Sequence, residues 1–98
     1  MYAVFRENTY PTDIRIERDR GFVEFQKKHA DQPGYLGNMV VEAGDGRYLS
    51  ITLWTSEADM KAARQALGPV VSKLLDPLMA APSKLLGTGR VIVNDVMS

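Results

Sequence analysis

The chain has 98 residues, and its 12 Lys and Arg residues balance its 12 Asp and Glu residues, so the formal net charge at pH 7 is zero. This length fits one domain, which we expect to span residues 1–98. A balanced charge disfavours nucleic acid as a partner, because binding to phosphates needs a concentrated basic surface. The sequence has no cysteine, which excludes disulfides and thiolate nucleophiles, and its one histidine provides no cluster of metal ligands.

The apolar segments are short. None approaches the roughly 18 apolar residues of a membrane-spanning helix, and Arg6 and Glu7 interrupt the stretch that a signal peptide would need. We therefore expect a soluble, cytoplasmic protein that has no membrane partner.

The first predicted elements are a strand and a helix. Residues 1–10 are rich in Tyr, Val, Phe and Thr, which favour a strand, and a turn signal follows at residues 11–13. From about Ile16 the pattern becomes helical, because Phe22, Phe25 and His29 follow one another at steps of three and four. Pro33 ends this helix, since the residue before a proline avoids the helical conformation.

Residues 35–43 and 47–54 are predicted to form a hairpin joined by Gly44-Asp45-Gly46. Leu49, Ile51 and Leu53 share one face of the second strand. A two-residue loop would place Asn38 and Glu42 beside this aliphatic face. A three-residue loop places Met39 and Val41 there and buries no charge, so we prefer it, with Gly46 in the left-handed conformation.

A second helix is predicted to begin after Ser56, which caps it with Asp59 as the reciprocal partner. Gly68-Pro69 interrupts the apolar stripe, so we expect two helical pieces, the second kinked or ended by Pro77. The last strand is expected at about residues 86–96, centred on residues 90–93.

The order strand, helix, strand, strand, helix, strand predicts a ferredoxin-like α+β domain with an antiparallel four-stranded sheet. Two helices cover only one face of such a sheet. We expect the aliphatic face, with Met39 and Val41, to meet the helices. The opposite face would then be uncovered and would need a second subunit or a ligand. It would present a mixed group of side chains: Leu36, Asn38, Val40, Tyr48, Ser50, Thr52 and Trp54.

Two segments resemble the antibiotic biosynthesis monooxygenase (ABM) domains. The residues 29–37, His-Ala-Asp-Gln-Pro-Gly-Tyr-Leu-Gly, resemble the step from the first helix to the second strand of that family. The residues 49–57, Leu-Ser-Ile-Thr-Leu-Trp-Thr-Ser-Glu, resemble its third strand leading into a capped acidic helix start. The resemblance runs from Tyr2 to about Val96 and implies a homodimeric α/β barrel in which two sheets pack face to face.

The resemblance also implies a chemistry. Such enzymes oxidise a small aromatic or quinone-like substrate without flavin, haem or metal, so the pocket must orient the substrate and stabilise an anion while oxygen reacts. The catalytic candidates are Trp54, which matches the family's aromatic position on strand three, and His29, as a general base. Arg6, Asn8 and Asn38 are candidates for binding substrate.

Each candidate also has a simpler interpretation. Trp54 and His29 could serve packing alone, and Arg6 could form a surface or interface ion pair. The haem-degrading branch of the superfamily uses a histidine on the second helical segment, and this chain has none between Ser56 and Pro82. We therefore disfavour that branch.

Two functions stay open from the sequence. One is a cofactor-independent monooxygenase with its pocket between sheet and helices. The other is a non-catalytic dimeric barrel that binds a small hydrophobic ligand or acts as a stress-related scaffold. Convergence of Asn8, His29 and Trp54 on one cavity would favour the enzyme.

Overall fold

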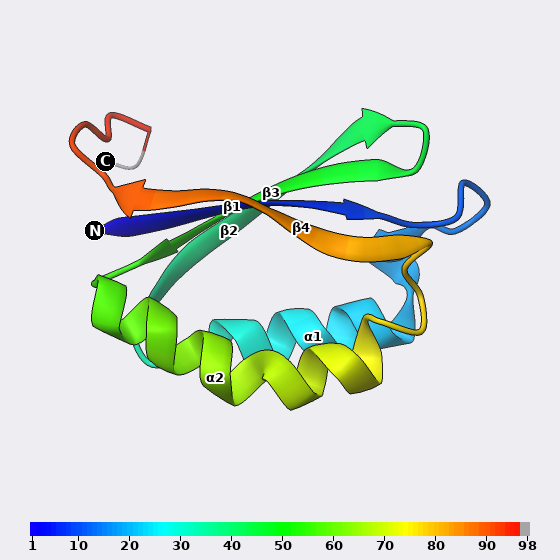
Figure 1. The fold of residues 1–98 in the computed structure, drawn as a ribbon, viewed down its shortest axis with the longest axis horizontal. Helices are drawn as coiled ribbons and strands as arrows, with labels where there is room; N and C mark the ends of the chain where they lie inside the picture. Colours follow the sequence, from blue (N-terminus) through cyan, green and yellow to red (C-terminus); the bar gives the residue numbers. More distant parts are fainter. Residues whose placement is uncertain (97–98) are drawn as a thin grey trace.

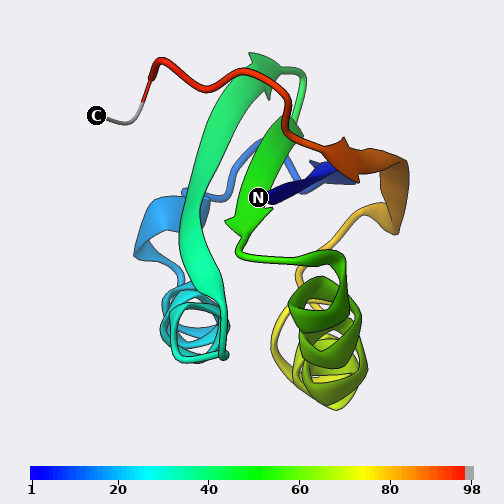
Figure 2. The same ribbon diagram turned by 90° about the vertical axis from the view of Figure 1, so that its left-hand side faces the viewer.

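The computed structural model describes residues 1–96; residues 97 and 98, the end of the expected domain, lie outside this part. The sheet has the antiparallel strand order β2-β3-β1-β4. Both helices cover the same face of the twisted sheet and lie side by side (Figures 1 and 2). The predicted ferredoxin-like fold is confirmed. Its elements are β1 (Tyr2–Thr9), a 3-10 turn (Ile16–Arg18), α1 (Arg20–Ala30), β2 (Tyr35–Gly44), β3 (Arg47–Trp54), α2 (Glu57–Leu74) and β4 (Ala81–Arg90).

Side-chain caps fix the start of both helices. The Asp19 carboxylate accepts hydrogen bonds from the backbone N–H groups of Gly21 and Phe22, so α1 begins after it rather than at Ile16. The Ser56 hydroxyl caps α2 as predicted, accepting from the Asp59 backbone N–H at 3.1 Å. The Asp59 carboxylate does not complete a reciprocal cap, because it accepts the Thr55 hydroxyl instead.

The predicted break in the second helix is wrong. Helix α2 continues through Pro69 as a single element. Proline at this position removes the hydrogen bond to the Gln65 carbonyl and crowds that oxygen with its ring. Leu67 and Leu75 are both buried, one on each side of Pro69, and this packing holds the helix together across the missing bond.

The predicted position of the last strand is also wrong, because β4 ends at Arg90 and residues 91–95 form no regular element. Strand β4 is defined by its partner β1, with Tyr2 opposite Arg90 and Thr9 opposite Ala81. Since β1 begins at Tyr2, the last bond of the ladder runs from the Val91 N–H to the Met1 carbonyl. Within residues 1–96 the apolar residues beyond Val91 pair with no strand.

The predicted hairpin register is confirmed, with Met39 opposite Ile51 and Val41 opposite Leu49. The turn itself is tighter than expected: Gly44 pairs with Arg47, and a register shift between Glu42 and Gly44 absorbs the extra residue. Gly46 has a φ of 77°, as predicted, and a Cβ there would collide with the Tyr10 carbonyl oxygen.

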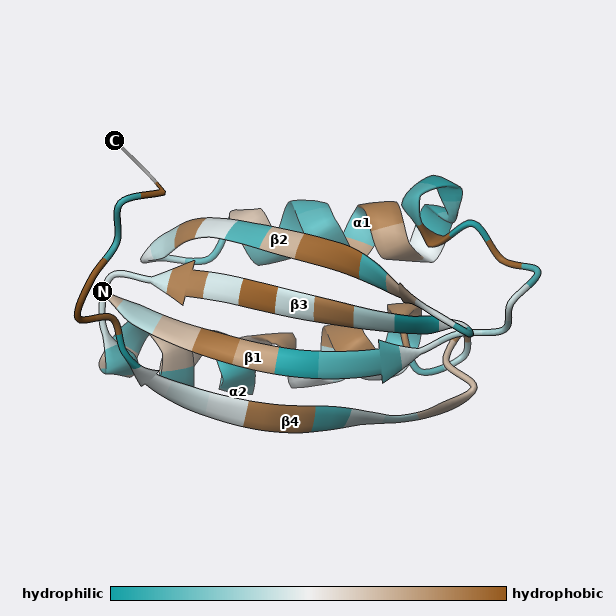
Figure 3. Ribbon diagram, turned by 90° about the horizontal axis from the view of Figure 1, so that it is seen from above, coloured by the Kyte–Doolittle hydropathy of each residue, from teal (hydrophilic) through white to brown (hydrophobic). Residues whose placement is uncertain are grey.

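The prediction of which sheet face meets the helices is wrong. The buried face of β3 carries Tyr48, Thr52 and Trp54, with 8%, 7% and 3% of their surface exposed, whereas Met39 is 53% and Val41 is 46% exposed. The prediction chose the aliphatic face because the other face also carries polar residues. Each large aromatic side chain on that other face, however, buries more area than an aliphatic one and fills the space under the helices. The aliphatic face is therefore the uncovered one. Figure 3 views the sheet from this side, with both helices behind it.

The space between sheet and helices is filled at both ends. One cluster joins Tyr10, Ile16 and Tyr48. The other packs side chains of β1 and β3 against α2; it consists of Val4, Trp54, Met60, Ala63 and Leu67. The candidate site lies between these two clusters, in the middle of the space between the sheet and the helices. Within residues 1–96 no helix is both long and apolar enough to cross a membrane.

Candidate functional site

A cavity of about 290 Å³ lies between the sheet and the two helices. Every candidate that the sequence singled out lines it: Arg6, Asn8, His29, Asn38 and Trp54. Three strands and helix α1 supply these side chains, so residues far apart in the sequence converge on one space.

The pleat of the strands explains this convergence. Alternate residues of a strand point to the same face, so Arg6 and Asn8 of β1 turn toward the helices together. On β3 the residues Thr52 and Trp54 do the same, and Asn38 of β2 lies directly opposite Thr52. The predicted register therefore sets which polar groups enter the cavity.

One wall of the cavity is aromatic. His29 lies between three rings, with ring-centroid distances of 5.2 Å to Phe25, 5.1 Å to Tyr35 and 5.6 Å to Trp54. Trp54 is only 3% exposed and belongs to the core cluster. The tryptophan thus packs the core and lines the cavity at once, and the two interpretations of it from the sequence are not exclusive.

The imidazole of His29 is held neutral at physiological pH. Its side chain is 9% exposed, and burial lowers its pKa from 6.5 to about 4. Its Nδ1 is buried and has no hydrogen-bond partner. A buried nitrogen without a partner is costly, so a ligand hydroxyl that bonded to it would be stabilised.

Two more polar atoms of the cavity wall lack partners: Asn8 Oδ1 and the Tyr10 hydroxyl. Burial raises the pKa of Tyr10 to about 12, so this phenol stays protonated and can donate. The neighbouring Asn8 side chain partly offsets this increase in the pKa of Tyr10. The two side chains nevertheless do not have the geometry of a hydrogen bond. Both groups are free to bind a ligand.

Asn38 is already engaged. Its Oδ1 accepts the Thr52 hydroxyl at 3.0 Å, and its Nδ2 donates to Gln26 Oε1 at 3.4 Å. This chain of bonds ties β3 and β2 to α1. Asn38 is therefore better placed to shape the wall than to bind a ligand with a free amide.

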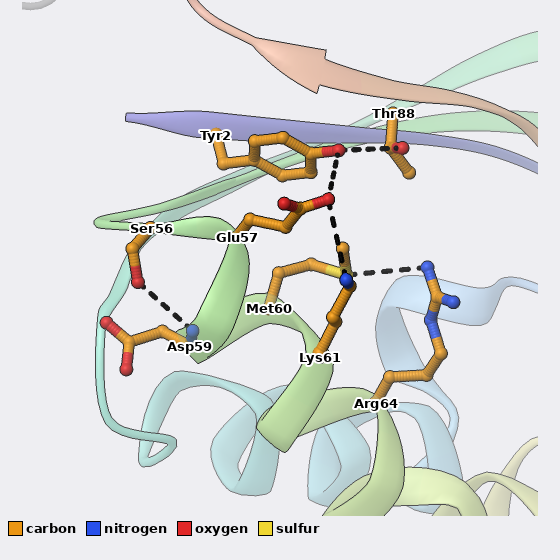
Figure 4. A network of polar contacts seen from close by, with 8 residues as sticks. All are labelled: Tyr2, Ser56, Glu57, Asp59, Met60, Lys61, Arg64 and Thr88. Carbon is orange, nitrogen blue, oxygen red and sulfur yellow. Dashed lines mark hydrogen bonds and ion pairs between the residues drawn. The ribbon is translucent and has the colours of Figure 1, made fainter.

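The sequence analysis missed two further residues, Tyr10 and Arg64. Tyr10 continues the alternation of Arg6 and Asn8 by one step beyond the strand, and this spacing could have identified it. Arg64 follows Met60 by one helical turn and reaches the cavity from α2, with its Nη2 donating to the Met60 sulfur at 3.4 Å (Figure 4).

The polar groups of this site are amides, aliphatic hydroxyls, phenols, an imidazole and guanidinium groups. No three His, Cys, Asp or Glu side chains in the described part of the chain come together as a metal site. The cavity is therefore equipped to hold an organic ligand by ring packing and a few hydrogen bonds.

No protein-family model matches the sequence, and neither does any curated protein. Solved structures do match. A variant of SnoaB, a cofactor-independent oxygenase from Streptomyces nogalater, superposes with a TM-score of 0.72 at 18% identity, over 97% of each chain. An antibiotic biosynthesis monooxygenase superposes with a TM-score of 0.71 at 14% identity, over 95% of this chain and all of the other. The chain has the ABM fold.

The haem-degrading enzyme MhuD from Mycobacterium tuberculosis also shares this fold, with a TM-score of 0.66 at 21% identity over 96% of this chain and 98% of its own. Identities this low establish the fold and leave the activity open. The resemblance inferred from residues 29–37 and 49–57 is confirmed at the level of structure.

Proposed function

We propose that the chain is a cofactor-independent monooxygenase that oxidises a small aromatic or quinone-like molecule in the cavity between sheet and helices. The observation that supports this best is the convergence of Asn8, His29 and Trp54 on one cavity, with unpartnered polar atoms on Asn8 and His29. SnoaB, which shares this fold, is a cofactor-independent oxygenase.

The reaction can balance without a cofactor when the substrate is itself the reductant. A reduced ring CH₂ group and O₂ give a ring carbonyl and water, so one oxygen atom enters the product and the other leaves. The protein then has to orient the ring and stabilise the anion that forms when the ring loses a proton.

The cavity residues divide these tasks. The aromatic wall of Phe25, His29 and Trp54 holds the ring. The neutral His29 imidazole accepts a hydrogen bond from a substrate hydroxyl, since a pKa of about 4 makes it too weak a base to keep the proton, and Asn8 binds a substrate oxygen. The positive charge of Arg6 at the cavity stabilises an anionic substrate.

Oxygen consumption with 1,8-dihydroxyanthrone, in buffer containing EDTA, tests this proposal. We expect a rate above spontaneous oxidation, and its loss in Asn8→Leu and in His29→Phe. Asn94→Leu, a change of the same kind outside the cavity, should keep the rate. An unchanged rate in both cavity variants would contradict the assignment.

A non-catalytic binding role is the second candidate. It is favoured by the burial of His29 and Trp54, which together form part of a packed aromatic cluster. Native mass spectrometry of the protein purified from cells would favour this role if an aromatic molecule stayed bound while oxygen consumption was absent. A cytoplasmic location stays a prediction that cell fractionation would test.

We also propose that the protein is a homodimer formed through the uncovered sheet face. That face is aliphatic, and Phe5 (42% exposed), Met39 and Val41 stand on it. Beyond β4, Ile92, Val93 and Val96 are 76–80% exposed in the single chain. Such an apolar surface needs a partner, and a stable interface of about 1,600 Å² could be provided by a second copy.

Sedimentation of a matched pair of variants tests the dimer. Val41→Glu places a charge on the uncovered face, whereas Val23→Glu places it on an exposed part of α1. We expect the first to be a monomer and the second to stay a dimer. A monomeric wild-type protein at micromolar concentration would overturn the proposal.

A further inference from the structure

Two guanidinium groups face the cavity without a carboxylate. Arg6 reaches it from β1 and Arg64 reaches it from α2. Neither forms any of the ion pairs found in the described residues. Their bonds go to neutral atoms instead, from Arg6 Nη1 to the Ser83 hydroxyl at 3.4 Å and from Arg64 Nη2 to the Met60 sulfur.

The acidic side chains nearest along these elements have other partners. Glu7, next to Arg6, points to the opposite sheet face and pairs with Arg47 and Lys84. Glu57, two turns before Arg64, pairs with Lys61 and accepts the Tyr2 hydroxyl (Figure 4). The positive charge at the cavity therefore stays uncompensated within residues 1–96.

The two charges affect one another. Burial lowers the pKa of the Arg6 guanidinium, and the positive charge of Arg64 lowers it further. Arg6 is half-buried, whereas Arg64 is exposed, so the cost of bringing the two like charges together falls mainly on Arg6. An anion that entered the cavity would relieve this repulsion and would gain charge-assisted hydrogen bonds from both arginines.

We propose that the ligand of this cavity is an aromatic carboxylate, with its carboxylate bound by Arg6 and Arg64 and its ring against the wall formed by His29 and Trp54. The planar guanidinium fork matches a carboxylate, and the aromatic wall matches a ring. This inference rests on the proposed function and specifies its substrate class. The carboxylate is a handle that positions the ring and takes no part in the oxidation.

Binding of two isosteric probes, 2-naphthoate and 2-naphthamide, tests the inference by isothermal titration calorimetry on the full chain. Trp54 is the only tryptophan, so quenching of its fluorescence shows that a probe occupies the cavity. We expect naphthoate to bind about tenfold or more tightly than the amide. This preference should be lost in Arg64→Gln and Arg6→Gln, and it should be kept in Arg20→Gln, which changes an exposed arginine outside the cavity.

The outcomes separate this inference from the proposed function. Equal binding of both probes would overturn the carboxylate while leaving aromatic binding intact. A preference for naphthoate that persists in both cavity variants would place the anion elsewhere and would also overturn it. Absence of binding by either probe would overturn the inference together with the aromatic site. Oxygen consumption is measured separately with 1,8-dihydroxyanthrone. Binding of naphthoate together with no consumption above the spontaneous rate would support the carboxylate site and contradict the monooxygenase alone.

Discussion

Burial of His29 predicts a loss of stability in mild acid. The folded protein holds this imidazole at a pKa of about 4, whereas the unfolded chain has the ordinary value of 6.5. Between these values the unfolded state binds more protons than the folded state, so the free energy of unfolding falls as the pH falls. The contribution of His29 is fully present above about pH 6.5 and is lost progressively down to about pH 4.

The size of this effect follows from the shift. One pKa unit corresponds to about 1.4 kcal/mol, so the whole shift is worth about 3 kcal/mol, of which about 2 kcal/mol is lost between pH 7 and pH 5. In a domain of this size each kcal/mol moves the melting temperature by roughly 4–8 °C. We therefore expect His29 alone to lower the melting temperature by about 8 °C or more over this interval.

Thermal and urea unfolding of the wild type and of His29→Phe, each from pH 7 to pH 5, measure this contribution. The phenyl ring keeps the contacts of His29 with its aromatic neighbours and cannot be protonated. The variant should be at least as stable as the wild type at pH 7, because an unpartnered buried nitrogen is removed, and its stability should depend less on pH. The same pH dependence in both proteins would refute the reasoning.

Three further substitutions test the fold around the cavity by thermal unfolding. Gly46→Ala should destabilise the protein by roughly 1–3 kcal/mol, because the φ of 77° and the nearby Tyr10 carbonyl leave no place for a Cβ. Gly89→Ala should cost little, because a Cβ added there would meet no neighbouring atom within 4 Å. Trp54→Ala should cost about 3–5 kcal/mol, and Trp54→Phe clearly less; equal losses would contradict the packing role. Pro69→Ala should stabilise α2 by about 1–3 kcal/mol, since it restores an N–H donor to the Gln65 carbonyl; a loss of stability would show that the proline conformation is needed.

The sequence predicted those parts of the fold that local chemistry decides. The hairpin register followed from keeping Asn38 and Glu42 away from the aliphatic side of β3, and this choice also placed Asn38 in the cavity. The Ser56 cap followed from the hydroxyl alone. In each case the decisive interaction lies within a few residues or across one pair of strands.

The incorrect predictions depended on distant partners. The apolar run of residues 91–93 favours a strand, but no strand of the described residues pairs with it. Pro69 breaks an isolated helix, but burial of the residues around it keeps α2 intact. Both sheet faces carry large apolar residues, so composition could not decide which face the helices cover. Among the cavity residues, Arg64 was missed because a charged side chain on a helix is ordinarily exposed, and Arg64 is itself exposed although it follows the buried Met60 by one turn.

The helices cover the sheet face that the sequence predicted to be uncovered, and this has a consequence for function. A close-packed aliphatic layer under the helices would leave no space for a ligand. The face that the helices cover instead combines aromatic rings with Asn8, Asn38 and Arg6, which cannot close into a dry core, and the cavity lies among them. The aliphatic residues Met39, Val41 and their neighbours are left on the other face, where association of two chains would bury them. One sheet thus separates the ligand site from the proposed dimer interface, so a substitution such as Val41→Glu can alter assembly without changing a residue that lines the cavity.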